Sequence, residues 1–327
     1  MSEGSLAGWV PIRLYWRDGK PFVDWCRMDN KRFSEPFFDD TVGALMRLPF
    51  NLLIRHQTPV ETLLDWATRQ PGIAPTGFIF HMSRCGSTLI SQMLAAAPRN
   101  IAISEAAPID SVVRAQNDGR ASESDRIAWL RAMVSALGKR RNGDEMRLFI
   151  KFDSWHILDF PIIRRAFPTA PWIFVYRDPV EVLVSQMRQR AASMLPAVMG
   201  SLLPGIDRRE AILMKAEEYC ARVLARICQA ALDHHRDGGM LVNYRQLPDA
   251  VYGPVNRFFD ANWTTDEAER MRVASQLSAK SPFVVFADDS AKKNTEATQQ
   301  VRAMAATWVI PIYDQLEAAR QRQRQFP

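Results

Sequence analysis

Cysteine, histidine and long apolar runs are all scarce in this sequence of 327 residues. The four cysteines show no C-x-x-C spacing, so we expect free thiols in a reducing compartment rather than a disulfide framework. No run of eighteen apolar residues occurs, and the first residues lack a basic region followed by an apolar one. These patterns predict neither a transmembrane helix nor a signal peptide. We therefore expect a cytoplasmic protein that does not associate with membranes.

The five histidines show neither H-x-x-x-H spacing nor pairing with a cysteine, and we therefore predict no metal site. The net charge is +6, a mild excess that suits an anionic cofactor or substrate. No basic stripe indicates nucleic acid as a partner. Apolar residues make up 47% of the chain, enough for one large domain with an appendage or for two domains.

The strongest local pattern lies at residues 77–91, where a short apolar segment, a polar turn and an amphipathic segment follow one another. Residues 77–80 have the composition of a buried parallel strand. The turn runs from His81 to Gly86, and Ser87 and Thr88 open the helical pattern. This order directs backbone N–H groups and the positive end of a helix at one point, which favours binding of a phosphate.

The turn differs from the phosphate loop of nucleotide triphosphatases, because Ser87 occupies the position of their lysine. A positive charge lies instead two residues before the glycine, at Arg84. The resulting pattern resembles the 5′-phosphosulfate loop of sulfotransferases that use 3′-phosphoadenylyl sulfate (PAPS). The resemblance implies that Arg84, Cys85, Gly86, Ser87 and Thr88 bind this co-substrate, through side chains and backbone N–H groups.

A second pattern follows the apolar segment 172–176, where Arg177-Asp178-Pro179 precedes a helix that carries Ser185. An arginine at a strand end and a hydroxyl two turns into the next helix can converge on one phosphate. The pattern resembles the 3′-phosphate site of the same sulfotransferases. The two motifs together specify PAPS rather than ATP. The resemblance spans about residues 75 to 310 and is closest to the protein-tyrosine and carbohydrate sulfotransferases.

Alternating patterns predict an α/β fold, with a parallel sheet flanked by helices on both faces. The resemblance implies a core like that of the P-loop nucleotide triphosphatases. Strands are predicted at 77–80, 148–151, 172–176 and 240–244, with a short strand before Glu105. Helices are predicted at 87–97, 107–116, 124–141, 154–167, 179–190, 211–235, 265–278 and 295–321.

Residues 1–74 carry no recognisable chemistry, and we assign them to an accessory segment beside a domain at 75–327. A hairpin is predicted at 9–28, with its turn at Asp18-Gly19. A helix is predicted to begin after Thr58, with Thr58 and Glu61 forming a capping box, and to end at Gly72.

Two weaker similarities extend the expected PAPS site. The segment 241–247 resembles a family strand that ends in Y-E-x-L, although Arg245 replaces the acid, and Tyr244 is expected to approach the cofactor. Lys292 and Lys293, in a predicted loop before the last helix, occupy the place where the family often positions basic residues over the 3′ phosphate. The family's G-x-x-G is absent there, and a solvated charge pair is the alternative.

The resemblance also implies catalytic residues. Lys151 ends a predicted strand and matches a family lysine that holds the sulfuryl oxygens. Glu105, twenty-one residues after Arg84, matches the catalytic glutamate of protein-tyrosine sulfotransferases and is the favoured general base. As a base it requires burial that raises its pKa. His156 is the rival candidate. The thiol of Cys85, at a helix start beside Arg84, is expected to have a lowered pKa.

These patterns predict a sulfotransferase that moves a sulfuryl group from PAPS to a hydroxyl or amine by in-line transfer, without a metal. The acceptor class stays open among small molecules, carbohydrates and peptides, and the sequence does not specify an oligomeric state. Two alternatives remain: a P-loop nucleotide kinase or ATPase, and a nucleotide-binding module without catalytic activity.

Overall fold

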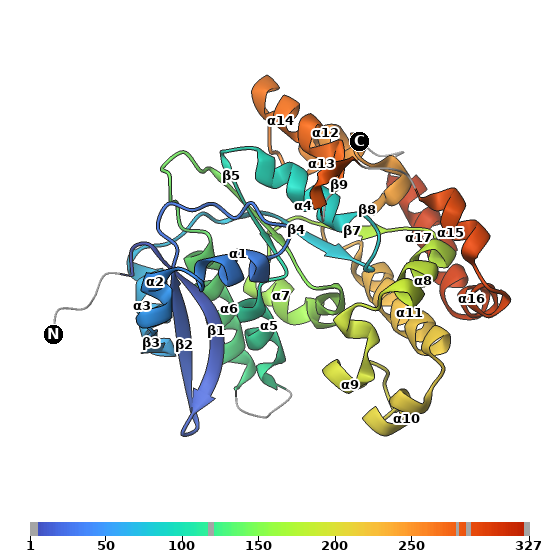
Figure 1. Ribbon diagram of the computed structural model, residues 1–327, viewed down its shortest axis with the longest axis horizontal. Helices are drawn as coiled ribbons and strands as arrows, with labels where there is room; N and C mark the ends of the chain where they lie inside the picture. Colours follow the sequence, from blue (N-terminus) through green and yellow to red (C-terminus); the bar gives the residue numbers. More distant parts are fainter. Residues whose placement is uncertain (1–5, 117–120, 279–280, 286–288, 324–327) are drawn as a thin grey trace.

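A computed structural model describes residues 6–116, 121–278, 281–285 and 289–323. Its centre is a sheet of five parallel strands in the order β5-β6-β4-β7-β8, which confirms the predicted α/β fold (Figure 1). The strands are β4 (Pro75–His81), β5 (Asn100–Ser104), β6 (Arg147–Lys151), β7 (Trp172–Tyr176) and β8 (Gly239–Asn243). Every residue of β5, β6 and β7 is buried, as expected for a parallel sheet that is covered on both faces.

Helices follow most strands, as right-handed β-α-β connections require. The longer helices between β4 and β8 are α4 (Ser87–Ala96), α5 (Ala107–Val113), α6 (Glu123–Leu137), α7 (Phe160–Ala166), α8 (Pro179–Arg188) and α11 (Ala216–His234). Short 3-10 turns add η1 (Arg114–Gln116), η2 (Ser154–Asp159), η3 (Ala192–Met194) and η4 (Tyr244–Gln246). The other elements of this part of the chain are α9 (Pro196–Met199), α10 (Arg208–Leu213), α12 (Asp249–Tyr252), α13 (Pro254–Phe258), α14 (Thr265–Ser275), β9 (Leu277–Ser278) and β10 (Ser281–Val285).

The register of the sheet brings the loops that carry the predicted site residues to its carboxyl edge. His81 of β4 pairs with Val175 of β7, and Ser104 of β5 pairs with Lys151 of β6. All four residues lie at or next to the carboxyl ends of their strands. The turns that follow are therefore neighbours at the edge where parallel sheets bind ligands.

The N-terminal segment forms a separate antiparallel sheet of β1 (Trp9–Arg17), β2 (Lys20–Arg27) and β3 (His56–Pro59) with helices α1 (Phe38–Leu45), α2 (Pro49–Leu53) and α3 (Val60–Arg69). The predicted hairpin is present. The predicted capping box is wrong, because Thr58 lies in β3 and its Oγ1 accepts a hydrogen bond from Trp25. Figure 1 shows this segment at one end of the molecule and the C-terminal helices at the other.

The last predicted helix, 295–321, is interrupted. The chain forms α15 (Ser290–Glu296), α16 (Gln299–Met304), a π-helical stretch (Ala305–Val309) and α17 (Ile310–Gln323). Thr298 accepts a hydrogen bond from the N–H of Val301 and starts a new helix there. Lys292 and Lys293 consequently lie on α15 and not in a loop, which corrects the sequence-based prediction.

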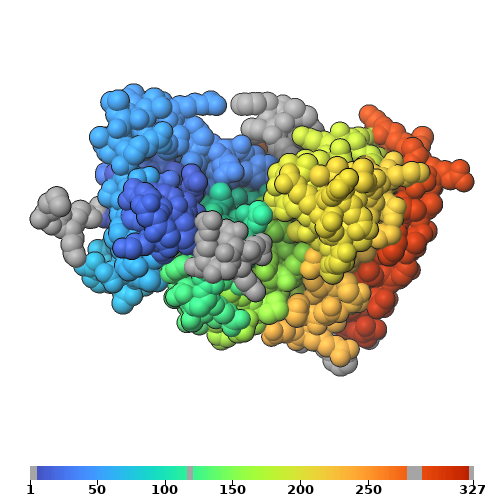
Figure 2. Space-filling model, turned by 90° about the horizontal axis from the view of Figure 1, so that it is seen from below, coloured from blue at the N-terminus to red at the C-terminus, as the bar shows by residue number. Residues whose placement is uncertain are grey.

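The N-terminal segment and the region around α10 lie apart on one face of the molecule (Figure 2). Figure 2 shows the N-terminal segment, in blue, and the region around residue 210, in yellow, on opposite sides of the face seen from below. Within the described ranges, no helix combines the length and apolar character needed to cross a bilayer.

Candidate functional site

The turn between β4 and α4 has the backbone of an anion-binding loop. Ser83, Arg84 and Gly86 have left-handed φ angles of 73°, 52° and 89°. The Ser83 N–H donates a 3.0 Å hydrogen bond to Nδ1 of His81, which fixes the start of the turn. A turn that contains left-handed residues can direct several N–H groups to one side, and the first N–H groups of α4 add to them. The local geometry suits a phosphate.

Tyr244 packs against this loop. A Cβ atom on Gly86 would lie 2.8 Å from Cδ2 of Tyr244 and 2.9 Å from Cδ1 of Leu247. Glycine is thus required at this position both by the φ of 89° and by the close approach of the tyrosine ring. Tyr244 begins the 3-10 turn η4 directly after β8, one residue beyond the end of its strand.

Arg177, which follows β7, contacts the same tyrosine. Its Cζ is 3.9 Å from the ring centre of Tyr244, a cation–π contact. Its Nε lies 2.5 Å from Glu181, and its Nη2 lies 2.9 Å from Asp289 and 3.0 Å from the Ser290 hydroxyl. The guanidinium is buried and held by these groups. A phosphate could therefore bind Arg177 only by displacing the carboxylates of Glu181 or Asp289.

Asp289 forms ion pairs with both Arg177 and Lys293. Its Oδ2 lies 2.9 Å from Nζ of Lys293, while Lys292 is exposed. Burial opposes its ionisation, but the hydrogen bonds from Lys293 and Arg177 outweigh this and lower the pKa of Asp289. Asp289 is therefore part of an ion-pair network. Asp288 lies outside the described residues.

A cavity of about 470 Å³ opens beside these groups. It is lined by Leu89, Arg177, Asp178, Glu181, Tyr244, Arg245, Leu247, Pro248, Ser275, Ser290 and Asn294. A larger cavity of about 1040 Å³ lies along β8 between α13 and α17, and among its described lining residues none is a predicted site residue.

The two predicted phosphate turns are direct neighbours. The backbone N–H of Arg177 donates to Sδ of Met82 at 3.2 Å, and the thiol of Cys85 donates to the Val175 carbonyl at 3.0 Å. Arg84 donates a 2.6 Å hydrogen bond to the carbonyl of Gln189, the residue that follows α8. Arg84 is absent from the described lining of the 470 Å³ cavity, and so is Ser185, which is half-buried on α8.

The thiol of Cys85 does not have the lowered pKa that the sequence predicts. Its side chain is fully buried, and burial raises the pKa of the thiol to about 12, although nearby N–H groups and cations lower it in part. Ser87 is also buried, whereas Thr88 is partly exposed. The role of Cys85 is therefore limited to its backbone and its packing.

Glu105, Lys151 and His81 form a compact cluster at the ends of β4, β5 and β6. Glu105 Oε1 lies 2.5 Å from Nζ of Lys151 and 3.3 Å from Nε2 of His81. The Lys151 side chain is 0% exposed, and its Nζ lies 4.9 Å from the centre of the Phe37 ring. The accessory segment therefore reaches the site through Phe37, which the sequence did not reveal.

The pKa of Glu105 contradicts the expectation that burial raises it. Burial alone would do so, but the Lys151 ammonium and His81 outweigh it and hold the pKa of Glu105 far below its usual range. The backbone of Glu105 is also left-handed, with φ of 54°, and its N–H donates to the Lys151 carbonyl at 2.8 Å. Glu105 is thus a fixed counter-ion of Lys151.

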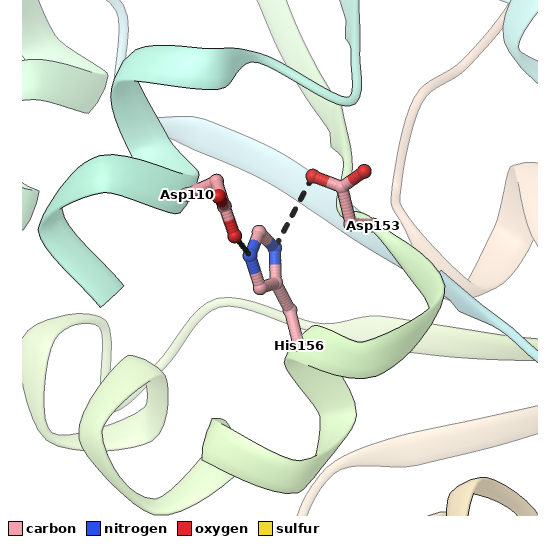
Figure 3. Close-up of side chains that lie close together, drawn as sticks. All are labelled: Asp110, Asp153 and His156. Carbon is pink, nitrogen blue, oxygen red and sulfur yellow. Dashed lines mark hydrogen bonds and ion pairs between the residues drawn. The ribbon is translucent and has the colours of Figure 1, made fainter. Parts of the chain in front are cut away.

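His156, the rival base, lies between two carboxylates (Figure 3). Its Nε2 is 2.9 Å from Oδ1 of Asp110, which also accepts a 3.0 Å bond from Trp155, and its Nδ1 is 3.8 Å from Oδ2 of Asp153. Burial opposes protonation of the imidazole, but the Asp110 hydrogen bond and the Asp153 charge outweigh it and raise the pKa of His156. The ring is 1% exposed, so a substrate cannot contact it directly.

Sequence reasoning did not identify Asp110 and Asp153, because neither belongs to a motif. The one available signal for Asp153 was its position, two residues after Lys151 at a strand end. The three residues Asp110, Asp153 and His156 also offer ligand atoms within 4.8 Å of one another, which is close enough for all three to contact one metal ion. Two N–H donors already occupy Oδ1 of Asp110, which favours a hydrogen-bonded cluster instead.

Comparison with known proteins identifies the sequence family of the chain. The sequence profile described as "Sulfotransferase family" matches residues 75–250, slightly more than half of the chain. No curated protein sequence matches the chain.

Solved structures give weaker likenesses. The sulfotransferase domain from the curacin biosynthetic pathway is 17% identical with a TM-score of 0.42, covering 72% of this chain and 96% of that one. Sulfotransferase STF9 from Mycobacterium avium is 14% identical with a TM-score of 0.48, covering 78% and 79%. Retinol dehydratase in a complex with retinol and PAP is 12% identical with a TM-score of 0.36, covering 79% and 86%. Because these scores are low, the family assignment depends on the sequence profile.

Proposed function

Because the chain belongs to the sulfotransferase family, we propose that it transfers a sulfuryl group from PAPS to a hydroxyl or amine acceptor. One observation carries this proposal. The ring of Tyr244 contacts both phosphate turns, lying against Gly86 of the first and against Arg177 of the second. A single nucleotide with phosphates at its 5′ and 3′ positions fits two such adjacent turns better than a linear triphosphate does.

In this proposal the first turn binds the 5′ end of the nucleotide. The left-handed residues Ser83 and Arg84 and the N-terminus of α4 supply backbone donors, and the Ser87 and Thr88 hydroxyls supply two more. The guanidinium of Arg84 adds charge that stabilises the leaving phosphate. This guanidinium donates a hydrogen bond to the carbonyl of Gln189, just beyond α8.

The second turn binds the 3′ phosphate. Arg177 provides a buried guanidinium, and Lys293 shares Asp289 with it. Ser185 lies on the same face of α8 as Glu181, one turn further along, and is proposed as an additional donor. Lys292 is exposed and is proposed only as a source of long-range positive potential.

PAPS supplies an activated sulfuryl group when it is bound. Around that group, Lys151 is proposed to stabilise the sulfuryl oxygens through its positive charge and not by direct contact, because its side chain is fully buried at the strand end that adjoins the first turn. Glu105 fixes the ammonium by the 2.5 Å ion pair. The general base is proposed to be a carboxylate of this region. Glu105 is the carboxylate that the sequence offers, and the imidazole of His156 is the rival candidate.

The division of the chain is also a proposal: residues 1–74 as an accessory segment and 75–327 as the catalytic domain. The contact between Phe37 and Lys151 supports a role for the accessory segment as a wall of the acceptor site. The acceptor class stays open among small molecules, carbohydrates and peptides. A kinase or ATPase is not favoured, since Ser87 occupies the position of the phosphate-loop lysine.

The proposal is tested by incubating the protein with PAPS and a panel of phenols, alcohols, sugars, amines and tyrosine peptides. Mass spectrometry detects a product heavier by one sulfuryl group. ATP with Mg²⁺ replaces PAPS in the control. Transfer from PAPS supports the proposal, and phosphoryl transfer from ATP in the absence of any sulfated product would contradict it.

A further inference from the structure

We propose that Asp153 is the group that takes the proton from the acceptor, with His156 sharing that proton and Asp110 holding His156 in position. The inference rests on the proposed function, since it assigns a step of sulfuryl transfer. It names a residue that neither phosphate motif contains.

Asp153 lies where the reacting groups are expected to meet. It follows Lys151 by two residues at the carboxyl end of β6, and Glu105 follows the adjacent strand β5. Both of these charges are close enough to affect the pKa of Asp153. Its side chain is 11% exposed, against 1% for the imidazole of His156. Asp153 can therefore contact a small group that enters from the strand edge, whereas His156 cannot.

The hydrogen bonds of His156 orient it toward Asp153. Oδ1 of Asp110 accepts from Nε1 of Trp155 and is paired with Nε2 of His156, so Nε2 carries a proton. Nδ1 then faces Oδ2 of Asp153 at 3.8 Å and, within the described part of the chain, is a buried atom with no hydrogen-bond partner. A proton taken up between Asp153 and Nδ1 would satisfy it. Figure 3 shows the two carboxylates on opposite sides of the ring.

The competing carboxylate is less suited to the task. Glu105 is tied to Lys151 and His81, which keep its pKa far below its usual range. Burial raises the pKa of Asp153 to about 7, with the charges of Glu105 and Asp110 adding to the rise and those of His156 and Lys151 opposing it. A carboxylate whose pKa is near the working pH is an effective proton acceptor.

For a hydroxyl acceptor, the acceptor oxygen forms a bond to sulfur while its proton moves to Asp153. The bond between sulfur and the 5′-phosphate oxygen breaks, and its electron pair stays on that phosphate. Asp110 is 23% exposed and offers a route by which the cluster later returns the proton to solvent.

The test uses the full chain and two substitutions of aspartate by asparagine. Asp153→Asn removes the proton acceptor, and Asp65→Asn, at an exposed position on α3, is the control. PAP affinity by calorimetry and the melting temperature show whether each variant is folded. Asp153→Ser serves as a second variant if Asp153→Asn fails to fold. Turnover is measured with PAPS and 4-nitrophenol, and by acceptor-free hydrolysis of PAPS, across pH 5 to 9.

We expect Asp153→Asn to bind PAP as the unmodified protein does but to lose at least about a hundredfold in turnover. The turnover of the unmodified protein should rise with pH near neutrality, as Asp153 loses its proton. The substitution should abolish this rising limb of the pH profile. The groups that face Asp153 and His156, and so shape this limb, are Glu105, Asp110, Lys151 and Asp159. Asp65→Asn should change turnover by less than about twofold.

A second readout needs no acceptor. Infrared spectra of the PAP complex should contain the C=O stretch of a buried protonated carboxyl near pH 6, and Asp153→Asn should remove it. Retained turnover with an unchanged limb, or a carboxyl band that persists in Asp153→Asn, would overturn the inference. Turnover that is abolished by EDTA and restored by a divalent cation would also overturn it in favour of a metal at the same residues. Failure of the unmodified protein to bind PAP would instead contradict the proposed function.

Discussion

The guanidinium of Arg177 lies over the ring of Tyr244, with Cζ 3.9 Å from the ring centre. Gly86 is a second neighbour of that ring, so one tyrosine contacts both of the turns that are proposed to bind the nucleotide. This arrangement links the loop after β4 to the loop after β7 through the residue that follows β8. The site is consequently assembled from three adjacent strands, and each contact can be tested by substitution.

Replacement of Arg177 by alanine should weaken PAP binding by about tenfold to a hundredfold, the cost of a lost charge-assisted hydrogen bond to phosphate. Arg270→Ala, an exposed arginine paired with Asp266 on α14, is the control and should leave the affinity unchanged. Isothermal titration calorimetry gives both values. Equal affinities for the two variants would remove Arg177 from the nucleotide site.

The Gly86→Ala substitution should lower PAP affinity and destabilise the fold, because the new Cβ would meet the Tyr244 ring at 2.8 Å. Gly143→Ala is a matched control. Gly143 has a nearly identical φ of 86°, but a Cβ atom added there would have no other atom within 4 Å. The control isolates backbone strain, about 1 kcal/mol, from crowding. If both variants melt at the same temperature and bind PAP equally, the contact of Tyr244 with the loop has no energetic importance.

Glu105→Gln should lower the free energy of unfolding by about 3 kcal/mol at pH 7, because it leaves the buried Lys151 ammonium without its counter-ion. The pKa of Glu105 is lowered in the folded protein, so its stabilisation is complete above the ordinary glutamate pKa of about 4.3 and is lost as the pH falls through the folded value. Urea unfolding of both proteins at pH 7 and pH 4 should give a smaller difference at the lower pH.

The exposed Glu61→Gln on α3 is the control for this comparison and should differ from the unmodified protein by less than about 0.5 kcal/mol. A Glu105→Gln variant as stable as this control at pH 7 would show that the Glu105–Lys151 pair does not stabilise the fold.

Cys85 should resist alkylation in the native protein. Its thiol is buried and its pKa is raised to about 12, so the thiolate is scarce at pH 8. All four cysteines are buried, and peptide mapping after iodoacetamide treatment should find them unmodified until denaturant is added. Rapid labelling of Cys85 alone, with loss of PAP binding, would indicate a loop that opens far more than its geometry suggests.

The parallel sheet and the turns after β4 and β7 could be predicted because each depends on local patterns, whereas phosphate binding by these turns stays a prediction. Apolar segments such as 172–176 predict buried strands, and the residues after them mark turns at helix starts. The neighbours of Lys151 could not be predicted in the same way. Phe37 reaches it from the accessory segment, and Asp110 reaches His156 from α5, so these contacts depend on tertiary packing that no spacing encodes.

Other errors have local causes. Thr58, Pro59 and Glu61 have the composition of a helix start, but pairing of Thr58 with Val23 in the N-terminal sheet outweighs that preference. The pKa values of Glu105 and Cys85 were misjudged for a common reason. Their sign depends on which charges and how much solvent surround each group, and a sequence motif does not specify these surroundings.

The most direct test of the central claim is a calorimetric comparison of adenosine 3′,5′-bisphosphate with ATP·Mg²⁺ on the full chain, repeated with Arg177→Ala. If the two turns hold one nucleotide, the bisphosphate should bind at least about a hundredfold more tightly than ATP·Mg²⁺, and the substitution should remove most of that preference. Binding of ATP·Mg²⁺ as tight as that of the bisphosphate, unaffected by the substitution, would contradict the claim.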